Sequence, residues 1–211
     1  MITRRAVLLG LVAATPAAPG IPADNRLAFR LSRNADPVGT HVLTFTRRAD
    51  GFDIRIAVDI AVRFGPIPLY HYTLRGLEQW RDNQLAKLEA TTDDDGTADF
   101  ARVTREADGL WVEGSAGPRY RAPANALPGT HWNLAELNGP WINPQNGQLL
   151  RPTVERLGRD VVQLGNGRKV EASQFVVGGD VHMALWYDVN RDWTALRAPG
   201  KDGSTISYDL I

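Results

Sequence analysis

The residues that decide the fold run from Phe52 to Phe64 and read F-D-I-R-I-A-V-D-I-A-V-R-F. Every second side chain is apolar and either β-branched or aromatic, and the side chains between them are aspartate, arginine or alanine. This period of two predicts an antiparallel strand with one apolar face and one face in water. At about 3.3 Å per residue the strand would run roughly 40 Å, so the sheet that contains it must coil.

Turn-forming residues divide the rest of the chain into further alternating segments. Residues 27–31 and 41–45 alternate on either side of a turn-rich cluster at 34–39, which predicts a hairpin leading into the long strand. The Asp-Gly pair that ends 93–96 and the Asn166-Gly167 pair are signals for tight hairpins, the second for a two-residue turn.

Three local features complete the expected strand pattern. Gly76 is predicted to mark a β-bulge in the strand that ends near Trp80. Residues 153–157 and 160–164 are interpreted as two separate strands. In total the sequence predicts about eleven or twelve strands and little helix.

The alternating pattern breaks between residues 114 and 151, where prolines recur. Only Trp132 to Leu137 is expected to form a turn or two of helix. Such a long irregular segment in a small domain often covers a binding surface. Because the sequence offers little helix to cover the apolar face of the long strand, we expect an all-β fold. Its single, strongly curved antiparallel sheet would form a half-barrel closed by residues 114–151 or by a ligand.

Charge and cysteine content narrow the function classes. Lysine and arginine total 24, as do aspartate and glutamate, so no bulk positive field favours nucleic acid as a partner. The absence of cysteine removes disulfides, thiolate metal sites and a cysteine nucleophile. No serine lies in a Gly-x-Ser-x-Gly motif. We expect no cofactor.

The first residues predict export. Residues 1–5 are basic, 6–14 are apolar, and 13–20 are rich in small residues and proline, as in a secretory signal. Thr3 to Leu8 resembles a twin-arginine signal, although a general secretory signal is an alternative. The apolar run is shorter than the roughly 20 residues that span a bilayer. We expect a signal peptide over 1–20, and a single β-rich domain over 24–211 that is periplasmic or secreted and does not span the membrane.

Several short motifs carry a resemblance to known families. They are N-A-D-P-V-G-T-H at 34–41, Y-H-Y at 70–72, E-Q-W-R-D at 78–82, T-D-D-D-G at 92–96, A-L-W-Y-D at 184–188 and D-G-S-T-I-S-Y at 202–208. On these motifs the chain resembles a group of uncharacterised exported proteobacterial proteins known only as a domain of unknown function. Its end is similar to that of a broader periplasmic family, also of unknown function. The resemblance implies a curved β-sheet, lipocalin-like or similar to carriers of lipoproteins and lipids, and it implies no reaction.

The four histidines do not form a recognisable metal motif. No two of them have the short helical or turn spacing of a zinc site. A site assembled across strands from His41, His71 and His182 with Asp59 is an alternative, but hydrogen-bonded strand histidines are the preferred interpretation, and no metal is predicted.

The aromatic and amide residues of the irregular segment are the main candidates for ligand contact. Two tryptophans with neighbouring amides could stack on a ligand, or they could plug the open end of the sheet, which is the preferred interpretation. The candidate ligand-binding residues are Tyr70, Tyr72, His131, Trp132, Asn133, Trp141 and Trp186.

Three function classes follow. The first is a non-catalytic periplasmic protein that binds or carries an apolar or amphipathic envelope molecule, such as a lipid, or an envelope protein partner. The second is a periplasmic hydrolase or isomerase that uses His131 or His71 with a carboxylate. The third is a structural envelope component, which a large exposed apolar patch and a stable oligomer would distinguish.

Overall fold

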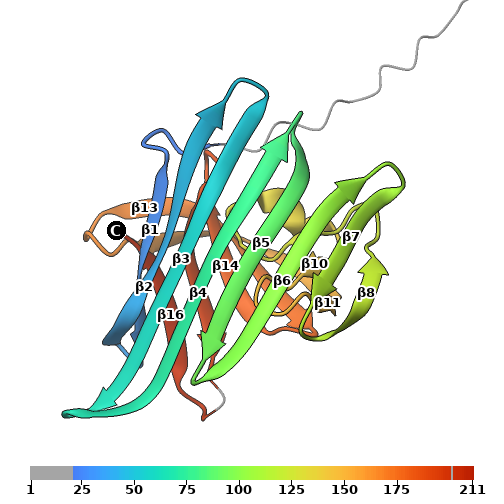
Figure 1. Ribbon diagram of the computed structural model, residues 1–211. Coiled ribbons are helices and arrows are strands. Elements are labelled where there is room, and N and C mark those ends of the chain that lie inside the picture. The colour runs from blue at the N-terminus through green and yellow to red at the C-terminus, as the bar shows by residue number, and fades with distance from the viewer. Residues whose placement is uncertain (1–20, 201) are drawn as a thin grey trace, which may run out of the picture.

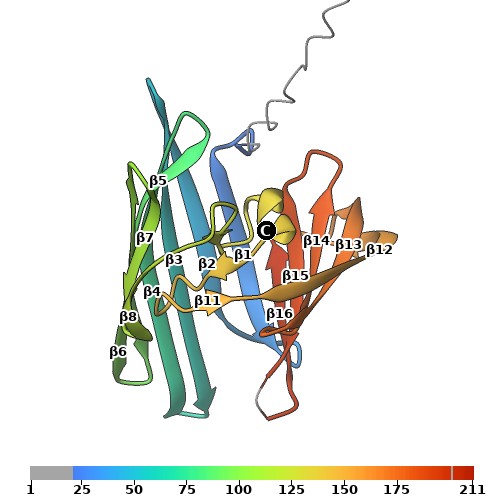
Figure 2. The same cartoon turned by 90° about the vertical axis from the view of Figure 1, so that its right-hand side faces the viewer.

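The computed structural model describes residues 21–200 and 202–211, and the predicted signal peptide at 1–20 therefore lies outside the described residues. Thirteen strands form one open antiparallel sheet in the order β12-β13-β14-β15-β16-β1-β2-β3-β4-β5-β6-β7-β8. Figures 1 and 2 show that this sheet curves so that β2 to β8 face β12 to β16, with the segment between β8 and β12 lying between them. The fold is all-β, as predicted. The number of strands was underestimated, since eleven or twelve were expected.

The strands of the main sheet have the following bounds: β1 Arg26–Arg33, β2 Asp36–Arg48, β3 Gly51–Phe64, β4 Ile67–Arg81, β5 Gln84–Asp94, β6 Thr97–Glu106, β7 Gly109–Gly114, β8 Gly117–Arg121, β12 Pro152–Gln163, β13 Lys169–Gly179, β14 Met183–Asp188, β15 Trp193–Pro199 and β16 Thr205–Leu210. The 3₁₀ helix η1 covers Leu134–Asn138, and a small second sheet joins β9 Leu127–Pro128, β10 Trp141–Ile142 and β11 Leu149–Leu150. Within the described residues, no helix has the length and apolarity needed to cross a bilayer.

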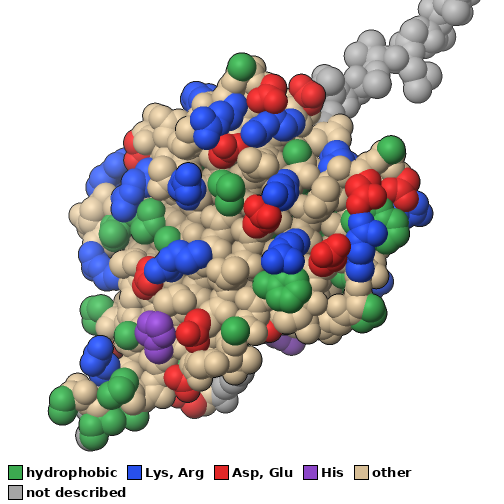
Figure 3. Space-filling model, viewed as in Figure 1, with side chains coloured by type: hydrophobic (Ala, Val, Ile, Leu, Met, Phe, Trp, Pro, Cys, Tyr) green, Lys and Arg blue, Asp and Glu red, His purple; other side chains and the backbone are tan. Residues whose placement is uncertain are grey.

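The long strand β3 faces inward as its period of two predicted. Phe52, Ile54, Ile56 and Val58 are buried, and Ile60 is half-buried against the same core. The side chains between them lie on the outer face, where Arg75 of β4 forms an ion pair with Asp59 at 2.5 Å. Figure 3 shows this outer face, on which basic and acidic side chains are interspersed. Burial on one side and charge on the other hold the register of β3, because a slip by one residue would exchange the two faces.

The predicted hairpins form. The β1–β2 hairpin places Phe29 opposite His41, and the β5–β6 hairpin closes through a two-residue turn in which Asp95 and Gly96 have φ angles of 52° and 89°. Only a side chain that tolerates positive φ fits the first of these positions easily, which is why the Asp-Gly pair was informative. The β12–β13 hairpin also forms at Asn166-Gly167, but its connection, residues 164–168, is longer than the expected two-residue turn.

Two local predictions were wrong. Gly76 is not a bulge, because it pairs regularly with Ile56 on one side and Ala90 on the other. A Cβ at this glycine would lie 3.4 Å from the Cβ of Ile56, which is an ordinary van der Waals contact, so neither a bulge nor a steric conflict explains the glycine. The two strands expected at 153–164 are one strand, β12, in which a bulge near Gly158 absorbs the break in alternation.

The segment between β7 and β12 is more ordered than the sequence indicated. β8 extends the main sheet by one strand that was not predicted, because Pro118 and the glycines around it obscure its alternation. The predicted helical turn is present as η1. Its first backbone N–H groups donate to Asn133, the N-cap: that of Ala135 to the side-chain oxygen and that of Glu136 to the carbonyl oxygen. The remaining residues, including β9 to β11, pack their apolar side chains into the space that the curved sheet encloses.

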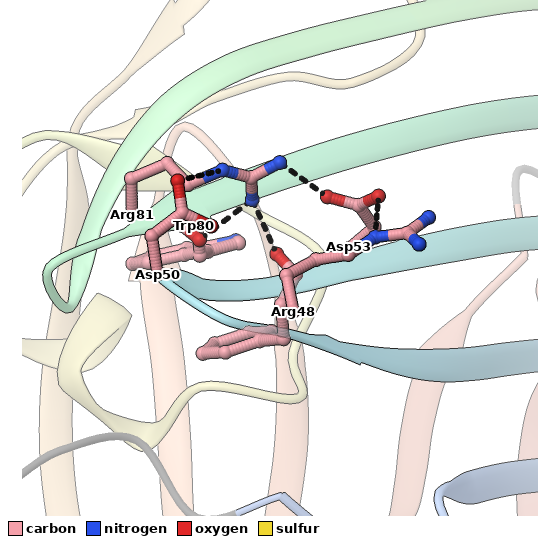
Figure 4. A network of polar contacts seen from close by, with 6 residues as sticks. Arg48, Asp50, Asp53, Trp80 and Arg81 are labelled. Carbon is pink, nitrogen blue, oxygen red and sulfur yellow. Dashed lines mark hydrogen bonds and ion pairs between the residues drawn. The ribbon is translucent and has the colours of Figure 1, made fainter.

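An ion-pair network fixes the other end of β3. Asp53 is 8% exposed and accepts hydrogen bonds from Arg48 Nε at 2.8 Å and from Arg81 Nη2 at 2.9 Å. Arg81 also contacts Asp50 and donates to the carbonyl oxygens of Phe52 and Trp80, as Figure 4 shows. Three neighbouring strands are thereby joined at the β2–β3 turn. Burial acts to raise the pKa of Asp53, but the hydrogen bonds and charges of the two arginines outweigh it and hold that pKa below its ordinary value.

We expect Asp53→Asn to lower the free energy of unfolding by about 1 to 2 kcal/mol, because it removes the charge from two charge-assisted hydrogen bonds. Asp59→Asn on the same strand is the matched control, since its half-exposed pair with Arg75 should contribute less than about 0.5 kcal/mol. Because the folded-state pKa of Asp53 is depressed, its contribution is present above the unfolded-state pKa of about 3.9 and is lost as pH falls through the folded value. Urea unfolding between neutral and acid pH measures the loss of stability and its pH dependence. Equal losses of unfolding free energy in the two variants would contradict a stabilising role for the Asp53 network.

Candidate functional site

A cavity of about 300 Å³ lies inside the curve of the sheet, between β2 to β4 on one side and β14 to β16 on the other. Its wall is built from inward-facing apolar side chains of β3, β4, β15 and β16, together with three tyrosines, two histidines and the loop at 129–131. None of these lining residues is lysine, arginine, aspartate or glutamate. A small, mostly apolar cavity with a few polar groups is typical of a small-molecule site.

His41 is the polar group whose surroundings are least complete. It lies on the inward face of β2, is 6% exposed, and lines the cavity. Neither its Nδ1 nor its Nε2 has a hydrogen-bond partner among the described residues. Burial, and secondarily repulsion from His131, lowers the pKa of His41 to about 3, so the ring is neutral and has one N–H donor and one nitrogen acceptor. A buried polar group without a partner costs about 1 to 3 kcal/mol, a cost that a hydrogen-bonding group placed in the cavity would offset.

His131 is held at the cavity wall by a buried carboxylate. Glu136, which is 1% exposed, accepts hydrogen bonds from the backbone N–H of His131 at 2.9 Å and contacts its Nδ1 at 2.7 Å. His131 has a φ of 66°, a left-handed conformation that is uncommon for a non-glycine residue. When a carboxylate oxygen of Glu136 accepts a hydrogen bond from Nδ1–H of a neutral imidazole, Nε2 of His131 is left as an acceptor. The ring of His131 also packs edge-on against Trp141 and Trp193.

A second buried carboxylate positions the loop that carries His131. Glu78 on β4 is fully buried and accepts hydrogen bonds from Trp80 Nε1 at 2.7 Å, Thr130 Oγ1 at 2.7 Å and Trp132 Nε1 at 3.1 Å. Burial raises the pKa of Glu78, although the three hydrogen bonds act in the opposite direction. Two of the three donors flank His131 in sequence, so Glu78 fixes the loop against β4 and thereby sets the position of the histidine.

Three of the predicted ligand-binding residues meet at this cavity. Tyr70 and Tyr72 extend inward from β4, and His131 joins them from the loop. The Tyr70 hydroxyl donates to Asp94 Oδ1 at 2.7 Å. Tyr208 of β16, which was not predicted, completes the polar wall, and burial raises its pKa to about 12, so its hydroxyl stays protonated.

The other four predicted residues lie elsewhere. Trp132 and Trp141 are buried in the core, where Trp132 packs edge-on against Phe45, Phe52 and Trp80 and both indole N–H groups have protein acceptors. Asn133 caps η1 through a hydrogen bond from Ala135. The indole of Trp186 belongs to a separate cluster with Val162 and Leu164 on the opposite face of the sheet. The plug interpretation therefore describes both tryptophans of the irregular segment.

The alternative zinc site is not assembled. His41 is buried, whereas His71 and His182 are exposed, and no group of three or more histidine, aspartate and glutamate side chains in the described part of the chain is placed to hold a metal ion. His71 lies on the outer face of β4, opposite to Tyr70 and Tyr72, as its position between them predicted.

Glu78 and Glu136 were missed as site residues. A signal for Glu78 was available, because it shares the inward parity of Tyr72, Leu74 and Trp80 and a charged residue on an apolar face requires partners. One partner, Trp80, is only two positions away, but the other two, Thr130 and Trp132, are about fifty positions away, and the sequence pattern does not connect them to Glu78. No comparable signal marked Glu136.

A second hollow, of about 310 Å³, lies over β12 to β14 and is lined by both signs of charge, including Arg156, Arg159, Glu171 and Asp188. Arg159 and Glu171 already pair with each other at 3.7 Å, so this surface presents no uncompensated charge of one sign. The inner cavity is the stronger candidate for a ligand site.

Comparison with known proteins agrees with this architecture. The chain is similar to the crystal structure of a β-barrel-like protein of the domain of unknown function DUF1849 from Brucella abortus, with a TM-score of 0.62 and 11% sequence identity over 88% of this chain and 94% of that one. At this identity the likeness shows the fold alone. No curated protein matches the chain. The predicted resemblance to an uncharacterised family related to another such family is confirmed, since the family model for the domain of unknown function DUF6134 matches residues 29–211, and the chain belongs to that family.

Proposed function

We propose that the protein binds a small apolar molecule bearing one uncharged hydrogen-bonding group, and that it acts as a binding or carrier protein in the cell envelope. The observation that carries the proposal is the uncharged cavity in which both ring nitrogens of His41 lack a protein partner. The envelope location rests on the signal peptide expected over residues 1–20. A lipid-like molecule with a hydroxyl or amide group fits this chemistry.

The wall selects the ligand by charge. Because no lysine or arginine lines the cavity, an anionic group would enter without a counter-ion and lose its hydration. A hydroxyl group can donate or accept, so it can pair with either nitrogen of the neutral His41 ring. An uncharged alcohol is therefore expected to bind more tightly than the carboxylate of the same chain length.

Binding is tested with N-phenyl-1-naphthylamine, an uncharged apolar fluorophore, displaced by decanol or by decanoate. Val58→Trp places a large side chain in the cavity and should weaken probe binding by about a hundredfold, at tenfold per about 1.4 kcal/mol of lost interaction. Val161→Trp is the control, since Val161 is 59% exposed on β12. Ile60→Trp, at a half-buried position, repeats the test if Val58→Trp does not fold. Unchanged probe affinity in a folded cavity variant would exclude the cavity as the site.

The role of His41 is tested by His41→Phe, which keeps a ring in place and removes both hydrogen-bonding nitrogens. We expect this change to weaken decanol binding by about tenfold and to leave the binding of decane nearly unchanged. An equal loss for the two molecules would show that His41 contributes shape alone.

A second candidate function is general acid–base catalysis on the bound molecule. The observation that favours it is the 2.7 Å contact between His131 Nδ1 and the buried Glu136, which orients the imidazole at the cavity wall. The alternative base, His71, is exposed on the outer face. His131→Gln separates the two functions, because a binding protein would keep its affinity whereas a hydrolase acting on an ester of the bound alcohol would lose turnover.

A further inference from the structure

The hairpin between β3 and β4 projects beyond the rest of the sheet. β2 pairs with β3 only as far as Ile60, and the β5–β6 turn reaches β4 only as far as His71. β3 and β4 continue to pair with each other up to Phe64 and Ile67. Residues 61–70 therefore form a two-stranded ribbon, which at about 3.3 Å per residue extends roughly 13 Å past the neighbouring strands. Figures 1 and 3 show it at the lower left of the molecule.

The tip of this ribbon is apolar and exposed. The side chains of Ile67 and Leu69 are 56% and 59% exposed. Pro66 and Pro68 on either side of Ile67 have no backbone N–H. Arg63 is the only charged residue between positions 61 and 70. In Figure 3 apolar side chains gather at this tip, whereas the sheet behind it carries interspersed charges. Exposed apolar side chains at a projecting point indicate contact with another apolar phase.

We propose that the ribbon tip at 65–69 inserts into the headgroup layer of a phospholipid bilayer. A narrow tip is too small for a stable protein interface, which typically covers about 800 Å² on each partner. The two prolines remove donors that a strand adding to the ribbon would need. Two apolar side chains can instead enter a bilayer surface one by one, while Arg63 extends along the ribbon to keep its guanidinium at the phosphates.

The backbone of the ribbon sets the depth of insertion. On the sides away from each other, β3 beyond Ile60 and β4 before His71 have no neighbouring strand in the described part of the chain. Their outward N–H and C=O groups must remain hydrated, since no water is available to them in the hydrocarbon core. The tip therefore stays at the membrane–water interface, and its binding to the bilayer is weak and reversible.

The ribbon is continuous with the cavity. Ile60 and Tyr70, the residues at its base, belong to the cavity wall. A molecule drawn from the bilayer at the tip would therefore reach the cavity wall at Ile60 and Tyr70. This last step rests on the proposed binding function, but insertion of the tip does not.

The proposal is tested by flotation of the protein, without its signal peptide, with phosphatidylcholine vesicles. The double variant Ile67→Ser with Leu69→Ser should lower the vesicle partition coefficient by about tenfold or more, since both side chains lose apolar contact. The matched control is Val161→Ser on β12 with Val189→Ser in the turn after β14. It removes side chains that are 59% and 73% exposed and should leave partition unchanged. Leu69→Trp should give a tryptophan emission band that shifts to shorter wavelength with vesicles.

Equal partition of the double variant and the control, or no partition of the wild-type protein, would overturn the proposal. A concentration-dependent oligomer that only the tip variant loses would instead assign the tip to a second copy of the chain, and would also overturn it. The naphthylamine probe keeps the two proposals apart, because the tip variant should bind it with unchanged affinity even when it no longer floats with vesicles.

Discussion

Replacing Glu78 with alanine is expected to lower the free energy of unfolding by about 3 to 5 kcal/mol, because it leaves three buried donors without an acceptor. The carboxylate is fully buried, so water cannot replace it without rearrangement of the core. The loss should appear in urea unfolding followed by tryptophan fluorescence. The naphthylamine probe should also bind more weakly, since the loop at 130–132 is no longer held against β4.

Glu78→Gln is the matched variant, because it keeps the shape and one acceptor oxygen. We expect it to lose about 1 to 2 kcal/mol at neutral pH. Its pH dependence supplies an independent check. The pKa of Glu78 is raised in the folded protein, so the native state holds the proton more tightly, and stability falls as pH rises from the unfolded-state value of about 4.3 through the folded one. Glu78→Gln should lack this slope, and an unchanged slope would assign it to another group.

The course of the sheet was predictable where the period of two is sustained. The sequence of β3 alternates from residue 52 to residue 64, and one slip would bury Asp59 and expose Ile56, so the sequence specifies the inward face. The Asp95-Gly96 turn was equally informative, because its positive φ angles restrict the residues that fit. Strand pairing between neighbours in sequence followed from these two signals.

Predictions were poorest where a feature depends on residues distant in sequence. The bulge in β12 interrupts its own alternation, so one strand resembled two. β8 was not recognised in the sequence because glycine and proline interrupt its alternation. It forms a strand because its backbone pairs with that of β7. The cavity also depends on residues that are distant in sequence, since its walls on β3 and β16 face each other only because the whole sheet curves.

In the candidate site too, the direction of a side chain could be predicted from the sequence, whereas its partners could not. The inward direction of His41 followed from its shared parity with Leu43 and Phe45, and that of Tyr72 from its parity with Leu74. The sequence did not show that His41 would lack a partner, because this depends on which side chains arrive from β15 and β16. The composition of the irregular segment made its tryptophans plausible ligand contacts. In the structure, however, Trp132 packs against Phe45 and Phe52 in the core and has little surface left for a ligand.

Trp193→Ala is expected to lower the free energy of unfolding by about 3 to 5 kcal/mol, the usual range for loss of a large buried aromatic side chain. Trp193 is fully buried at the start of β15 and links the two histidines of the site, with ring centroids 5.5 Å from His41 and 5.3 Å from His131. Its ring also packs against Phe29 at 4.0 Å. The substitution would leave a void behind both imidazoles, so they would no longer be held at the cavity wall.

The control for Trp193→Ala is Trp111→Ala on β7, where the indole lies under Arg119 on the outer face and donates to Asp108 at 2.9 Å. That tryptophan is half-buried and contributes mainly a cation–π contact, so its loss should amount to about 1 kcal/mol. The two variants remove the same atoms from the two faces of the sheet, and urea unfolding measures the difference between them. Equal losses would mean that the inner face is not the better packed one, and the cavity could not then be regarded as a preformed site with rigid walls.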